Sequence, residues 1–195
     1  MFTVFLRDAR IFDGLAGENE ETEKNWREGG VTSRISVVRV THNFFDVTGI
    51  PVGLGRPIQP GESESVVVSY GLWQHRLGAA PDVIGRKMIL DGRLYTIAGV
   101  LPRDHRTVTG FGYSPDLYLP ISDEGAVVAL FGRLPAGMTR AVAYARLEAT
   151  CRQLDGPHPP TGHEWARNIS VVAVAGMDGV RSDSQVVTIA ASLPC

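Results

Sequence analysis

Cysteines and long apolar runs are scarce in this sequence. Cys151 and Cys195 are the two cysteines among 195 residues, and neither lies in a CxxC or other zinc-ligand spacing, so the redox compartment stays undecided. The longest apolar stretches, such as residues 171–177, fall far short of the roughly 20 residues that a membrane-spanning helix needs. The first residues place their apolar run before Arg7, the reverse of the order in a signal peptide. We therefore expect no membrane span within the chain and see no export signal.

The sequence also lacks a surplus of either charge. It has 19 lysines and arginines against 21 aspartates and glutamates, a formal net charge of −2. A protein that binds nucleic acid or an anionic membrane surface usually carries a basic patch, so neither partner is expected. Hydrophobic residues make up 44% of the chain, which is enough to form the core of one domain or of two small lobes.

Phosphate-binding motifs are missing as well. The sequence contains no G-x-x-x-x-G-K-[ST] loop and no G-x-G-x-x-G turn. These loops hold phosphates on backbone N–H groups at the start of a helix, so ATP and dinucleotide cofactors are not expected by these routes.

The first 30 residues predict little regular structure beyond one helix. Apolar residues recur at helical spacing in residues 5–17, and Gly17 is placed to end the helix. The charged run that follows, residues 18–30, is typical of a solvated loop or of an interrupted helix that ends at Gly29 and Gly30.

The most specific local signal is the pair Asp91-Gly92 between two apolar runs. Both residues tolerate the positive φ angles of a type I′ turn, which predicts a β-hairpin. The other expected elements, in chain order, are a strand over 33–41, a helical segment over 42–49, an irregular glycine- and proline-rich stretch over 49–62, a strand over 65–69, a helix over 70–77, an extended piece over 116–120, a strand over 126–134, a helix over 140–154 with Thr139 as its N-cap, and a strand over 168–177. The last strand–helix–strand order indicates an α+β fold.

Ser69 stands where an expected strand meets an expected helix, and two interpretations compete there. As an N-cap, its hydroxyl would accept a hydrogen bond from a backbone N–H of the first helical turn, with Gly78 at the opposite cap. As a hydrolase nucleophile, it would need glycine two residues before it, and position 67 is Val67. His75 follows six residues later, but sequence spacing cannot place a base within reach of a nucleophile. The capping interpretation is favoured.

The remaining titratable residues give weak signals for chemistry. His158, His163 and Glu164 lie in a proline- and glycine-rich connector without the HExxH spacing of zinc enzymes, so no metal site is predicted. Three further residues, Asp104, His105 and Asp116, are single titratable groups in an expected loop, where such residues are mostly solvated. No catalytic residue is predicted.

Cys151 is predicted to be a small core residue. It lies on a helical stripe with Tyr144, Leu147 and Leu154, and a buried cysteine behaves mainly as a small apolar side chain.

Four strings, taken together and in order, resemble the periplasmic core domain of ABC-type permeases related to the macrolide exporter MacB, and within them the duplicated orphan permeases. They are "VTHNFFDVTGIPVGLGRPIQPGE", "VVVSYGLWQHRLGAAPDVIGRKMILDGRLYTIAGVLP", "PDLYLP" and "GRLPAGMTRAVAYARLEATCRQL". The positions that match the family pattern are Phe44, Phe45, Gly49, Gly55, Arg56, Trp73, Arg76, Gly85, Gly92 and Arg93. The sequence departs from that pattern at Thr48, where leucine is usual, at His105, where an aromatic residue is usual, and at Tyr118, which replaces a common tryptophan.

The resemblance implies an α+β fold with two lobes. A porter-like split β-α-β lobe would comprise residues 1–42 and 126–195, and a smaller β-rich lobe, sometimes called the sabre, would be inserted as residues 43–125. The family's first strand of the porter-like lobe has no counterpart in the expected elements.

The resemblance also implies a function without chemistry. The domain would lie outside the cytoplasmic membrane as part of an ABC transporter permease, joined to transmembrane helices and served by a separate ATPase subunit or domain. It would transmit conformational change or dock a substrate or another periplasmic protein, and it would need no cofactor or metal. Two alternatives remain open from the residues: a small secreted hydrolase, which requires a serine or metal within reach of a base, and a free-standing periplasmic binding module.

Overall fold

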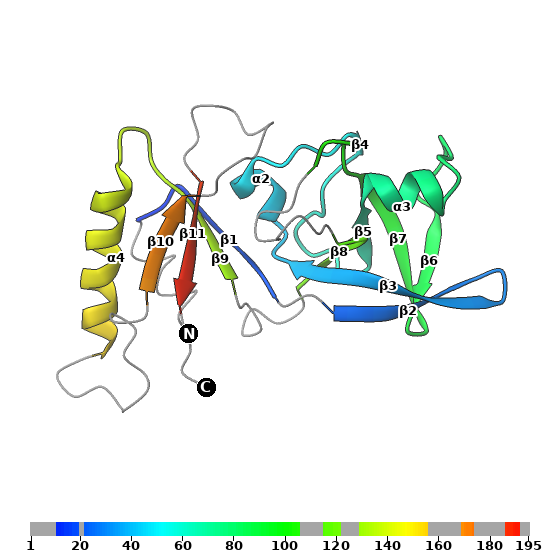
Figure 1. The fold of residues 1–195 in the computed structure, drawn as a ribbon, viewed down its shortest axis with the longest axis horizontal. Helices are drawn as coiled ribbons and strands as arrows, with labels where there is room; N and C mark the ends of the chain where they lie inside the picture. The colour runs from blue at the N-terminus through cyan, green and yellow to red at the C-terminus, as the bar shows by residue number, and fades with distance from the viewer. Residues whose placement is uncertain are drawn as a thin grey trace.

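The computed structural model describes residues 11–19, 22–105, 115–121, 129–155, 169–173 and 186–191. The fold is mixed α/β and rich in sheet (Figure 1). Its elements are β1 (Gly14–Glu18), β2 (Thr22–Glu28), β3 (Val31–Val40), α2 (Phe44–Thr48), β4 (Leu54–Gly55), β5 (Ser65–Val68), α3 (Tyr70–His75), β6 (Lys87–Leu90), β7 (Arg93–Val100), β8 (Leu117–Pro120), β9 (Ala129–Arg133), α4 (Arg140–Asp155), β10 (Ile169–Ala173) and β11 (Val186–Ala191).

Six strands form a closed ring. The pairing order is β3-β2-β6-β7-β5-β8, and β8 then pairs with β3 in parallel, which closes the sheet. Side chains alternate between the two faces of a strand, so every second residue points into the ring. The interior is accordingly apolar and includes Ile35 and Val37 of β3, Ile97 of β7, and Leu117 and Leu119 of β8.

Helix α3 lies at one end of this ring, directly after β5 (Figure 1). Leu72 of the helix and Leu77 beyond it are buried in the same apolar cluster as the strand residues. The half-buried Trp73 packs against that cluster and donates from Nε1 to the carbonyl of Ala80 at 3.0 Å. Arg76 stacks over the ring of Trp26, 4.3 Å from its centroid. Together these contacts close that end of the ring.

Four further strands extend the sheet in the order β10-β11-β9-β1, and β1 meets β3 through the pair Glu18 and Val40, while the short β4 pairs with β7 of the ring. Neighbouring residues of β11 point to opposite faces of this extension. Val186 packs in the cluster that holds Phe44 and Phe45 of α2, whereas Val187 packs with Ala143 of α4. Helices α2 and α4 therefore cover opposite faces of the extension (Figure 1).

The strand β3 belongs to both parts of the sheet. Its first residues pair with β2, its last four pair with β8, and Val40 also pairs with Glu18 of β1. The strands β2 and β3 precede residue 43 in sequence, but they pair with β6 and β8, which follow it. One hydrogen-bonded sheet thus connects the ring to the extension.

The helix expected over residues 5–17 is wrong where the structure describes it, because residues 14–18 form β1. This strand lies between β3 and β9 and has buried residues on successive positions, so it lacks the alternation that would have indicated a strand. Gly17, expected to end a helix, donates its N–H to Oγ1 of Thr41 at 3.1 Å. Residues 1–10 lie outside the described part.

The charged run 18–30 was also misinterpreted, because residues 22–28 form β2. Trp26 is the one buried side chain of this strand, while charged residues occupy its outer face, as in the ion pair of Glu23 with Arg34 at 2.7 Å. Contacts with residues of the neighbouring strands thus stabilise β2, although few of its own residues are apolar. Gly29 and Gly30 do not end a helix but form the β2–β3 turn, both at positive φ. Strand β11 was not anticipated at all.

The remaining expected elements are confirmed where the structure describes them, with two adjustments; residues 126–128, 168 and 174–177 of two expected strands lie outside the described part. Helix α3 ends at His75 with Arg76 as its C-cap, so Gly78 lies in the following turn instead of at the cap. On α4, Thr139 Oγ1 accepts from the N–H of Val142 at 3.3 Å, as an N-cap should. Tyr144 is exposed, however, and Ala143 takes its place on the buried face with Leu147 and Cys151. These three are four residues apart, about one helical turn.

Candidate functional site

Ser69 is a helix cap in the structure. Its Oγ accepts from the N–H of Leu72 at 3.1 Å, and its own N–H donates to the carbonyl of Asp116 at 2.8 Å. His75 is exposed on the last turn of α3, and within the described residues no hydrogen bond joins it to Ser69. The capping interpretation is confirmed by the Ser69–Leu72 bond.

Asp116 and His105 are also held by structural contacts. Oδ2 of Asp116 accepts from the N–H of Ser36 at 3.1 Å, while Ser36 Oγ accepts from the N–H of Asp116 at 3.2 Å, which fastens β8 to β3. Nε2 of His105 lies 3.0 Å from the hydroxyl of Tyr118. Burial lowers the pKa of His105 to about 4, and the nearby Asp104 only partly opposes this shift. The imidazole is therefore neutral at pH 7. Asp116 and His105 were expected to be solvated loop side chains, and the structure shows that both are held by other residues instead.

The other sequence candidates do not assemble into a site. His158, His163, Glu164 and Cys195 lie outside the described residues. Cys151 is fully buried in α4, as predicted for a core residue. Over the described part of the chain, no group of three or more His, Cys, Asp and Glu residues could hold a metal ion.

The structure reveals a groove that sequence reasoning missed. Its volume is about 310 Å³, and it lies at the end of the ring away from α3. Strands β3 and β8 end there, with Arg39 and Pro120 in the lining, and β7 begins there, at Arg93. The loop before β5 adds Gln59 and Glu62 as another wall. We call this feature the ring-end groove.

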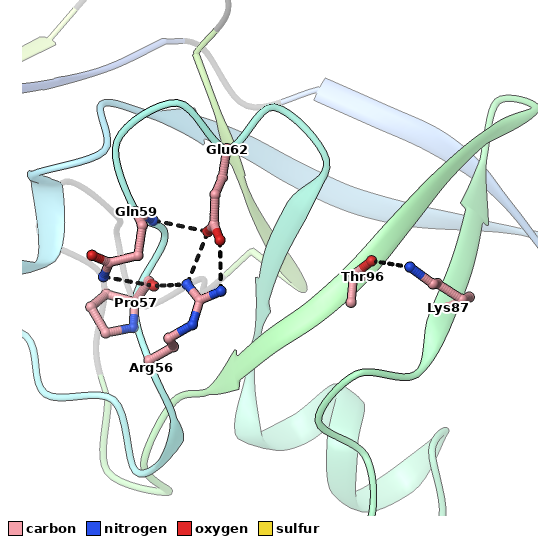
Figure 2. Close-up of polar contacts among 6 residues, drawn as sticks. All are labelled: Arg56, Pro57, Gln59, Glu62, Lys87 and Thr96. Carbon is pink, nitrogen blue, oxygen red and sulfur yellow. Dashed lines mark hydrogen bonds and ion pairs between the residues drawn. The ribbon is translucent and has the colours of Figure 1, made fainter.

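A bidentate ion pair shapes the loop wall of the groove (Figure 2). Nη1 and Nη2 of Arg56 lie 2.9 and 2.6 Å from the two carboxylate oxygens of Glu62, and the N–H of Gln59 donates to Oε2 at 3.0 Å. The hydrogen bond from Arg56 is the main reason why the pKa of Glu62 falls from 4.5 to about 2. The only carboxylate that lines the groove, among described residues, is thus ionised and already paired.

The neighbouring β6–β7 hairpin is held by polar contacts of its own. Lys87 Nζ donates to Thr96 Oγ1 at 2.6 Å across the two strands (Figure 2). At the turn, Asp91 accepts from Lys24 Nζ at 2.7 Å and from the N–H of Asn25 at 3.0 Å. These contacts, above all the hydrogen bond from Lys24, lower the pKa of Asp91 to about 2. The hairpin is thereby fixed to β2 beside Arg93, where β7 begins.

The arrangement can bind a ligand. The one carboxylate that lines the groove among described residues is held by Arg56, which keeps it from acting freely as a general base, and His42 also lines the groove. Two arginines dominate its charge instead. In the sequence, Arg93 was recognised only as part of a family motif. Arg39 and Arg93 line one groove because β3 and β7 belong to the same closed ring, and no local pattern reveals that closure.

No helix in the described part of the chain is both long and apolar enough to cross a membrane.

Comparison with solved structures identifies the fold. The periplasmic region of MacB from Actinobacillus actinomycetemcomitans is similar with a TM-score of 0.60 and 15% identity, covering 78% of this chain and 71% of that one. The extracellular domain of the noncanonical ABC-type transporter YknZ from Gram-positive bacteria gives a TM-score of 0.59 at 12% identity, covering 93% and 84%. A domain of a permease protein from Porphyromonas gingivalis gives 0.56 at 14% identity, covering 99% and 81%.

The sequence itself was also compared with families and with curated proteins. No curated protein matches it. The family described as "MacB-like periplasmic core domain" matches residues 6–150, well over half of the chain. Such domains are parts of ABC transporter permeases, which have transmembrane helices and an ATPase partner, and they lie on the periplasmic or extracellular side. The chain belongs to the family of MacB-like periplasmic core domains of ABC transporter permeases.

Proposed function

We propose that this domain is a mechanical relay, which transmits conformational change between the membrane part of its permease and a substrate or partner outside the membrane. It would perform no chemistry of its own. The observation that carries the proposal is the continuous sheet: hydrogen-bonded pairing runs from β10 to the ring without interruption. At the junction, β1 meets β3 through the pair Glu18 and Val40, and backbone hydrogen bonds from Thr41 to Gly17 and from Asn19 to Arg39 fasten the two strands further. A displacement of one part of the sheet would be passed to the other through these bonds.

The first and last described strands, β1 and β11, lie on either side of β9. Strand β9 pairs with β1 on one side and with β11 on the other, and Arg133 lies opposite both Gly14 and Val186. Membrane helices that lead into β1 and follow β11 would act on two strands that flank β9, although at opposite strand ends because β1 and β11 run in the same direction. The ring-end groove lies beyond β3. The two-lobe division at residues 43 and 125 and the assignment to the duplicated orphan permeases stay predictions.

Spin-label distances in the intact permease test the proposal. We would label Val142→Cys on α4 and Leu94→Cys on β7, both exposed, in a Cys195→Ser background, with the permease and its ATPase in nanodiscs. The distance between these labels should not change with ATP, whereas the distance from Leu94→Cys to a label in the parent membrane helices should change. A label pair within the ATPase provides the control for nucleotide binding. An unmoved Leu94→Cys label in an ATPase that does respond would refute the relay.

A hydrolase remains the alternative of another class, and a direct assay separates the two. The relay predicts no turnover of ester, peptide or glycoside substrates by the purified chain. Turnover that is abolished by Ser69→Ala would overturn it. The contacts of Ser69 favour the relay, since its hydroxyl already accepts the N–H of Leu72.

A further inference from the structure

The ring-end groove carries positive charge that nothing in the described structure neutralises. Arg93 makes no ion pair and no side-chain hydrogen bond with any described residue. Arg39 donates from Nη1 to the carbonyl of Pro120 at 3.2 Å, a neutral acceptor, and likewise makes no ion pair within the described ranges. Both arginines line the groove of a chain whose net charge is −2. The local charge thus opposes that of the whole protein.

The acidic residue in the groove does not balance these arginines. Both oxygens of Glu62 are engaged by Arg56, and one also accepts the N–H of Gln59. The Arg56–Glu62 pair is neutral as a unit, so Arg39 and Arg93 remain as two uncompensated cations. Arginine presents a planar fork of N–H donors that matches a carboxylate in a bidentate manner.

Tyr95 adds a hydroxyl that no described residue engages in a hydrogen bond. Its side chain is 2% exposed and lines the groove, and among described residues its hydroxyl has no hydrogen-bond partner. No fully buried side-chain polar atom in the described structure lacks a partner, so the hydroxyl must be the part of Tyr95 that reaches the groove. The aromatic ring of Tyr95 is fixed in the core of the strand ring, and its hydroxyl faces the ring-end groove, so it is suited to bind a ligand oxygen.

We propose that the ring-end groove binds a small organic acid through its carboxylate, with Arg39 and Arg93 as the charged partners and Tyr95 as a hydrogen-bond donor. The hydroxyls of Thr41 and Ser63 also line the groove and can bind other polar groups of the ligand. The volume of about 310 Å³ lies at the lower end of the range for small-molecule sites, which favours a small acid over a macromolecular segment. A carboxylate suits the groove better than phosphate, because its planar pair of oxygens matches the fork of one guanidinium. This site is independent of the relay proposed above.

The test is a titration of the ¹⁵N-labelled chain with succinate at constant ionic strength, followed by amide chemical shifts. Succinamide, which has the same carbon skeleton without charge, is the matched ligand control. Succinate should give saturable shifts confined to amides around the groove, such as those of Thr41, Gly61, Ser63 and Arg93, and succinamide should not. Shifts that spread over the surface without saturation would overturn the proposal.

Three variants make the titration specific. Arg93→Gln removes an exposed side chain that has no partner among the described residues, so the fold should persist while the dissociation constant rises about tenfold or more. Tyr95→Phe keeps the buried aromatic ring and removes only the hydroxyl, so it should weaken binding less than Arg93→Gln does. Arg34→Gln removes the same charge from an exposed arginine on the same strand as Arg39, paired with Glu23, and should leave binding unchanged. Equal weakening by Arg93→Gln and Arg34→Gln would reveal a general charge effect and refute the site.

Two further ligands decide the chemical class. Inorganic phosphate should bind more weakly than succinate, and a short polyglutamate peptide should bind no better per carboxylate than succinate. Tighter phosphate binding, or binding of the peptide without any response to succinate, would contradict the assignment to a small organic acid.

Discussion

The guanidinium of Arg133 in β9 lies against the end of α2, where it binds the carbonyl oxygen of Val47. Nε and Nη2 of Arg133 are 3.1 and 2.8 Å from that oxygen, and Nη2 also donates to the carbonyl of Asp46. The last carbonyl groups of a helix have no partner within the helix and carry partial negative charge, so a cation there is favourable. One side chain thus joins the helix over one face of the sheet to the strand between β1 and β11.

We expect Arg133→Met to lower the free energy of unfolding by about 1–3 kcal/mol, because the charged hydrogen bonds to the carbonyls of Asp46 and Val47 are lost while the aliphatic part of the side chain is kept. Urea denaturation followed by circular dichroism measures the change. Arg140→Met, at an exposed position on α4, is the matched control and should stay within about 0.5 kcal/mol of the parent chain. Equal effects of the two substitutions would show that the contact with α2 contributes nothing.

Ser69→Ala should lower the free energy of unfolding by about 1 kcal/mol, because the N–H of Leu72 loses its acceptor at the start of α3. Ser69→Asp should retain most of the parent stability, since aspartate caps helices about as well as serine. Thermal or urea unfolding of the two variants distinguishes them. If Ser69→Asp were as unstable as Ser69→Ala, the role of the hydroxyl as a cap would be wrong.

Two glycine-to-alanine substitutions should have opposite effects on stability. A Cβ at Gly99 would lie 2.5 Å from the carbonyl oxygen of Arg56 and 2.7 Å from Val52, so Gly99→Ala should destabilise by about 1–3 kcal/mol. A Cβ at Gly71 on α3 would meet nothing closer than Ser69 Oγ at 3.9 Å. Gly71→Ala should therefore stabilise by about 0.4–1 kcal/mol, as measured by urea unfolding. Similar values for both would contradict the close approach at Gly99.

His105 should make stability depend on pH in a defined range. Its pKa is about 4 in the folded chain against 6.5 for the free side chain, so the unfolded chain binds more protons between these values. The stabilisation is complete above pH 6.5 and is lost as the pH falls through about 4. His105→Phe should remove this part of the pH profile in urea unfolding at a series of pH values.

A direct NMR titration of the His105 ring is the control for that experiment. A ring that titrates near 6.5 in the folded chain would contradict the burial-driven shift, whatever the unfolding profile shows. The substitution keeps an aromatic ring next to Tyr118, which packs against His105 with centroids 5.9 Å apart.

Local chemistry was sufficient to predict several elements of the fold. Asp91 and Gly92 adopt φ angles of 48° and 79°, as a type I′ turn requires, because few other residue pairs tolerate both. Ser69 caps its helix because a serine at a strand–helix junction has one favoured use. In contrast, β1 could not be predicted, since it is buried at successive positions, and a strand covered on both faces needs no alternation of its own.

The ring-end groove was even less predictable from the sequence than β1. Arg39 and Arg93 are 54 positions apart in the sequence and neither has a motif around it that indicates a ligand. They line one groove because β3 and β7 belong to the same closed ring, and that closure depends on pairings between distant strands.

The local turns and caps, the absence of phosphate-binding motifs and, through the ordered strings, the family can all be inferred from the amino-acid sequence. These features depend on backbone preferences and side chains within a few residues of each other. That the charged segment 22–28 is a strand, and that two arginines share a groove with Tyr95, follows from the three-dimensional fold alone. Strand pairing and ring closure are cooperative, long-range interactions, and the residues that they bring together carry no record of this in their neighbours along the chain.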